Sequence, residues 1–93
     1  MYVGLLEVEG RIFASTSLKD KRRVILSAQT KIRQRFNLAV AEVGHENNRQ
    51  MTLLAVVGVG SSKQVVEQEL SRASTLLETT DGLDVFNNVI TFL

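Results

Sequence analysis

Four cations gather at a point of the chain where a helix is predicted to begin. Ser17 is followed three residues later by Asp20, which is the spacing of a capping box at a helix N-terminus. The same segment contains Lys19, Lys21, Arg22 and Arg23. Because the first turn of a helix carries a partial positive charge, each cation there costs about 0.3–1 kcal/mol. Free backbone N–H groups and side-chain cations would together bind an anion, so the pattern predicts an anion-binding site.

Two other groups of residues could carry chemistry, but structural roles explain them more simply. His45 lies between Glu42 and Glu46, and a histidine beside two carboxylates can bind a metal weakly or act as a general base. A histidine in a predicted turn is more often hydrogen-bonded to its neighbours. The glycine pair at residues 58–60 lacks the third glycine and the Lys-Ser/Thr of nucleotide-binding loops. We therefore expect no catalytic residue, cofactor or metal, and a protein that is not an enzyme.

Hydrophobic periodicity predicts the elements that would position these residues. Strands are predicted at residues 2–13, 38–43, 51–60 and 83–92, and helices at residues 17–36 and 61–78, with a short turn at residues 14–16. The order βαββαβ, with short connections, favours a ferredoxin-like α+β fold. Such a fold has a four-stranded antiparallel sheet, both helices on one face, and the first and third strands in the centre. Residues 1–93 are expected to form a single domain.

The first predicted helix is basic on its solvent side. Residues 19–35 contain seven cations and one acid, a net charge of +6, whereas the rest of the chain carries −5. At about 100° per residue, four of the cations share one arc with Leu26. The candidate binding residues are Lys19, Lys21, Arg22, Arg23, Leu26 and Arg33. This strip could contact the phosphates of RNA or a ribonucleoprotein, or an acidic protein surface, or it could simply be a solvated charged face.

The predicted sheet bears on which partners are expected. The strand at residues 51–60 contains no aromatic residue, so we do not expect RNA bases to stack on the sheet as they do on RNA-recognition motifs. Apolar residues of both parities predict an uncovered apolar face and hence a homodimer. Small acylphosphatases share this topology, but residues 10–14 read Gly-Arg-Ile-Phe-Ala where they carry Gln-Gly-Val-x-Phe-Arg. An enzyme acting on a phosphorylated small molecule is therefore the weakest hypothesis.

Composition sets the broad class of the protein. The chain has 93 residues, of which 44% are hydrophobic and 23% charged, and it contains no cysteine. No disulfide framework or cysteine metal site can therefore form. The longest apolar run, at residues 53–57, is too short to span a bilayer, and the first residues do not resemble a signal peptide. We expect a cytoplasmic protein with no membrane partner.

Several motifs together resemble the YlxP-like family of small bacterial proteins of unknown function. They are the segment at residues 17–23, then Arg35-Phe36-Asn37, Val40-Ala41-Glu42-Val43-Gly44-His45 and Gln50. The resemblance covers nearly the whole chain and implies a ferredoxin-like fold, but no biochemical activity. In many Gram-positive bacteria, genes of this family lie among those for transcription elongation, translation initiation and ribosome-binding factor A. That association favours a non-enzymatic protein linked to RNA or the ribosome, and a regulatory module that docks on an acidic protein is the alternative.

Overall fold

A computed structural model describes residues 1–13 and 16–93, and its elements follow the predicted order. They are β1 (Tyr2–Ile12), α1 (Leu18–Arg35), β2 (Ala39–Gly44), β3 (Met51–Gly60), α2 (Lys63–Glu78) and β4 (Leu83–Phe92). The four strands form one antiparallel sheet. The predicted α+β class with βαββαβ order is confirmed.

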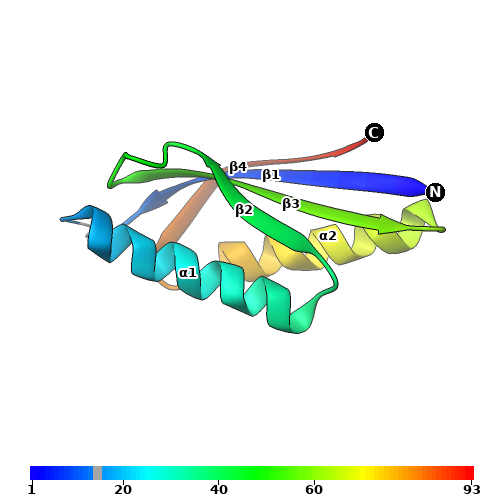
Figure 1. Ribbon diagram of the computed structural model, residues 1–93, viewed down its shortest axis with the longest axis horizontal. Helices are drawn as coiled ribbons and strands as arrows, with labels where there is room; N and C mark the ends of the chain where they lie inside the picture. The colour runs from blue at the N-terminus through cyan, green and yellow to red at the C-terminus, as the bar shows by residue number, and fades with distance from the viewer. Residues whose placement is uncertain (14–15) are drawn as a thin grey trace.

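The strand order is β2-β3-β1-β4, so β1 and β3 are central, as predicted. Both helices lie against the same face of the sheet, below it in Figure 1. α2 packs on β1, β3 and β4, whereas α1 packs mainly on β2. One side of α1 is therefore held against the sheet, and its opposite side faces solvent along the length of the helix.

Successive side chains of the central strands point alternately into the core and toward the uncovered face of the sheet. Leu6 and Val8 of β1 and Leu54 and Val56 of β3 are fully buried on the helix side. The helices complete this core with Ile25, Ala28, Ile32, Val66, Leu70, Ala73 and Leu77. Tyr2 has the same parity on β1 as Leu6 and Val8, but at the start of the strand it is 43% exposed.

The face of the sheet without helices mixes apolar and charged side chains. Val57 and Val59 of β3 and Val89 of β4 are exposed. Glu7 on β1 lies in register with Ala55 on one side and Val89 on the other. The apolar residues predicted for this face are present on it, and self-association through them stays a prediction.

Some boundaries differ from those predicted. β2 begins and ends one residue later than expected. The cap of α2 is Ser62, one residue after the predicted start of the helix, because the Ser62 hydroxyl accepts the hydrogen bond from the backbone N–H of Val65. The turn predicted at residues 14–16 falls largely outside the described residues. No helix in the described ranges is long and apolar enough to cross a membrane.

Candidate functional site

The start of α1 is capped as the sequence predicts. The Ser17 backbone is extended, and its hydroxyl accepts a hydrogen bond from the Asp20 backbone N–H at 3.1 Å. The Asp20 carboxylate in turn accepts from both the hydroxyl and the backbone N–H of Thr16, at 2.9 and 3.2 Å. The only acidic side chain of α1 is therefore engaged in closing the helix end.

Asp20 makes the helix start sensitive to acid. The Thr16 hydroxyl, followed by the Thr16 backbone N–H, lowers the pKa of the Asp20 carboxyl below its ordinary value. A lowered pKa contributes stability that is present above the unfolded-state value and is lost as pH falls through the folded-state value. The melting temperature of Asp20→Asn should lie below that of wild type at neutral pH, and the difference should shrink below about pH 4. Asp81→Asn is the matched control, and a difference that stays constant with pH would contradict this assignment.

Lys21 was predicted to contact a ligand with the other cations, but the structure buries its side chain instead of exposing it on α1. Its side chain is only 1% exposed, and its Nζ lies 3.0 Å from Glu42 Oε2. The same ammonium donates to the backbone carbonyls of His45 and Asn48. Its three N–H groups thus match three acceptors within the protein. A phosphate outside the helix cannot displace this set without unpairing a buried charge.

The contacts of Lys21 join the helix start to the β2–β3 connection. Glu42 Oε2 also accepts a hydrogen bond from the Thr52 hydroxyl, so one carboxylate links α1, β2 and β3. The sequence held a signal for this arrangement. Lys21, Ile25, Ala28 and Ile32 follow one another at intervals of four, three and four, which places the lysine in the buried stripe of α1.

The other predicted cations remain on the solvent side of α1. Lys19, Arg22, Arg23 and Arg33 are exposed, and Leu26 between them is 60% exposed. Arg33 also donates from Nη2 to the Val40 carbonyl at 3.2 Å, which ties its guanidinium to β2. The structure therefore brings together five of the six predicted residues as one exposed strip, hereafter the basic strip: Lys19, Arg22, Arg23, Leu26 and Arg33.

The His45 side chain lies beside Glu9 rather than Glu42. The backbone of His45 has a φ of +59°. Its Nε2 lies 3.4 Å from Oε2 of Glu9, which is on β1. Glu42 is instead engaged by Lys21. Among the described residues, no group of three or more histidine, cysteine or acidic side chains is placed to hold a metal.

The glycine pair before α2 serves packing. A Cβ added to Gly58 would lie 2.6 Å from Leu38 Cδ2, and one added to Gly60 would lie 3.0 Å from Val66 Cγ2. Both contacts are tighter than ordinary van der Waals contact, so glycine lets the strand end approach the side chains below it.

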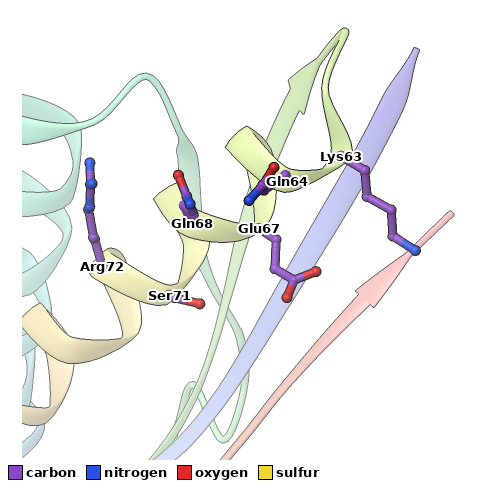
Figure 2. A pocket seen from close by; sticks show the side chains of 6 residues that line it. All are labelled: Lys63, Gln64, Glu67, Gln68, Ser71 and Arg72. Carbon is purple, nitrogen blue, oxygen red and sulfur yellow. The ribbon is translucent and has the colours of Figure 1, made fainter.

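The solvent face of α2 differs from the basic strip in charge and in shape. Figure 2 shows its side chains spread along the helix rather than directed toward a common point. They are Lys63, Gln64, Glu67, Gln68, Ser71 and Arg72. Lys63 Nζ lies 5.2 Å from the centre of the Phe92 ring, which holds it over the sheet edge. Here Glu67 and polar side chains lie between the two cations, Lys63 and Arg72. This face therefore supplies matched control positions for the basic strip.

Comparisons with known proteins agree with the fold and with the family that the motifs resemble. An uncharacterized protein of Bacillus subtilis (strain 168), YlxP, is 31% identical over 77 residues, which cover 83% of this chain and 84% of that protein. A de novo designed protein, Foldit4, has a TM-score of 0.60 at 15% identity and 96% coverage of both chains. That likeness shows the fold alone. The family described as a protein of unknown function, DUF503, matches residues 3–89, and the chain belongs to this family.

Proposed function

We propose that this protein binds RNA, alone or within a ribonucleoprotein, through the basic strip of α1, and that it acts by binding rather than by catalysis. The observation that supports this is the separation of charge within α1. Six of its seven cations are exposed, and its single acid, Asp20, is engaged by Thr16. Lys and Arg side chains arranged in this way neutralise phosphates and release their counterions.

The length of the basic strip suits a polymer better than a small anion. From Lys19 to Arg33 it spans about 21 Å along the helix axis, at roughly 1.5 Å per residue. No single phosphate could contact both ends. Leu26 in the middle adds an apolar contact that a sugar or base edge could use.

A salt titration tests this proposal directly. Binding of a labelled, single-stranded RNA would be followed by fluorescence anisotropy between about 50 and 200 mM KCl. If the four cations of the strip each neutralise one phosphate, the slope of log K against log [KCl] should be about −3, since each contact contributes about −0.7. Absence of RNA binding at the lowest salt would refute the proposal.

An acidic protein surface is the second candidate partner, because the exposed Leu26 amid cations also suits a protein interface. Co-purification from the native host, with and without nuclease, distinguishes the two. A partner that is retained after nuclease treatment binds the protein itself, whereas a partner that is lost was held through RNA.

A further inference from the structure

A groove of about 410 Å³ lies beside the basic strip, between α1 and the connection from β2 to β3. The side chains that line it are Lys21, Arg22, Ile25, Leu26, Gln29, Glu42, Glu46 and Asn47. Its volume falls within the range of about 300–1,000 Å³ that is typical of small-molecule sites. Arg22 and Leu26 belong to both the groove and the strip, so a ligand on the strip would reach the groove directly.

The wall of the groove opposite α1 is held in place by Lys21. The Asn48 backbone N–H donates to the His45 carbonyl at 2.9 Å, which closes a tight turn with Glu46 and Asn47 at its tip. The Lys21 ammonium binds the carbonyls of His45 and Asn48, the two residues that flank this tip. The Asn48 side chain further accepts from two backbone N–H groups that follow it. The two exposed side chains at the tip are thus carried by a backbone that is fixed before any ligand arrives.

The chemistry of the groove differs from that of the strip. Glu46 is exposed and takes part in no hydrogen bond or ion pair within the described ranges, whereas Glu42 is already engaged by Lys21 and Thr52. A carboxylate repels phosphate but accepts N–H groups, and the Watson–Crick edges of unstacked bases offer such groups. Guanine presents two N–H donors side by side, at N1 and N2, which match the two oxygens of one carboxylate. Arg22 offers a guanidinium plane on which the base could stack.

We propose that this groove binds one unstacked guanine base of an RNA strand whose phosphates lie on the basic strip. Glu46 accepts the N1 and N2 hydrogens, Arg22 and Leu26 contact the base plane, and Asn47 and Gln29 lie at the rim. The proposal rests on RNA binding by the strip. It adds sequence preference to contacts that would otherwise be independent of sequence.

The test compares three single-stranded RNAs: all-uridine, the same RNA with one central guanosine, and the same RNA with inosine at that position. Wild-type protein should bind the guanosine RNA about tenfold more tightly than the all-uridine RNA. Inosine lacks the N2 amino group and should lose most of this advantage. Glu46→Gln should also remove it, so that this variant binds the guanosine RNA and the all-uridine RNA with equal affinity. Glu67→Gln on the outer face of α2 is the matched control and should keep the preference.

The outcomes separate this inference from the proposed function. Equal, salt-sensitive binding of all three RNAs would overturn the guanine site and leave RNA binding by the strip intact. A guanosine preference that persists in Glu46→Gln, or that inosine shares fully, would overturn the assignment of the carboxylate. No binding of any RNA would overturn both proposals.

Discussion

Replacing Lys21 with methionine is expected to lower the free energy of unfolding by about 3–5 kcal/mol, the range for removing one partner of a buried ion pair. The change leaves the Glu42 carboxylate without its cation. It also leaves the carbonyls of His45 and Asn48 without the donor that the ammonium supplies. In a chain of this size such a loss corresponds to a fall of roughly 15–30 °C in melting temperature.

Thermal and urea unfolding of matched variants measure this effect. Lys19→Met, two residues away and exposed, should change stability by no more than about 0.5 kcal/mol. The double variant K21M/E42L should recover part of the loss, since it removes both charges together. If K21M were as stable as K19M, the ammonium would not hold the β2–β3 connection as described.

Reversing the charge of Arg22 and Arg23 should abolish salt-sensitive RNA binding by the basic strip. R22E/R23E removes two cations and adds two acids in the part of the strip nearest the start of α1. The loss of two phosphate contacts alone should reduce the salt slope by about 1.4, and repulsion adds to the loss of affinity. The melting temperature should stay near that of wild type, because both side chains are exposed and acids in the first turns of a helix interact favourably with its dipole.

K63E/R72E provides the matched control for charge. It makes the same change in net charge at two cations of α2, which Figure 2 shows, and touches no residue of the basic strip. RNA binding that falls equally in both double variants would show that net charge, rather than the strip, governs binding. RNA binding that is unchanged in R22E/R23E would refute the role of α1.

The sequence was sufficient to predict the sheet and its central strands, because the number and spacing of apolar residues differ between central and edge strands. Residues 51–60 and 83–92 were predicted with the bounds that the structure has. The capped start of α1 was also predictable, because a serine followed by an acid three residues later indicates a helix N-terminus.

The burial of Lys21 was not predicted, because its charge indicates the surface whereas its position around the helix axis indicates the core. Its spacing to Ile25 marks it as buried, but its residue type predicts exposure. The acceptors that make burial possible are mostly backbone carbonyls, which any residue carries, so residues 45 and 48 gave no sign in the sequence. The groove beside the strip was missed for the same reason, since it depends on where that turn lies.

The first and last strands lie side by side, and both ends of the described chain emerge together (Figure 1). The backbone N–H of Leu93 donates to the Val3 carbonyl at 2.9 Å, which joins the two ends. The start of α1 lies at the opposite end of a molecule whose long axis measures 43 Å. A fusion partner, label or surface tether attached to either end would therefore leave the basic strip accessible, and a short peptide joining the two ends would permit circular permutants.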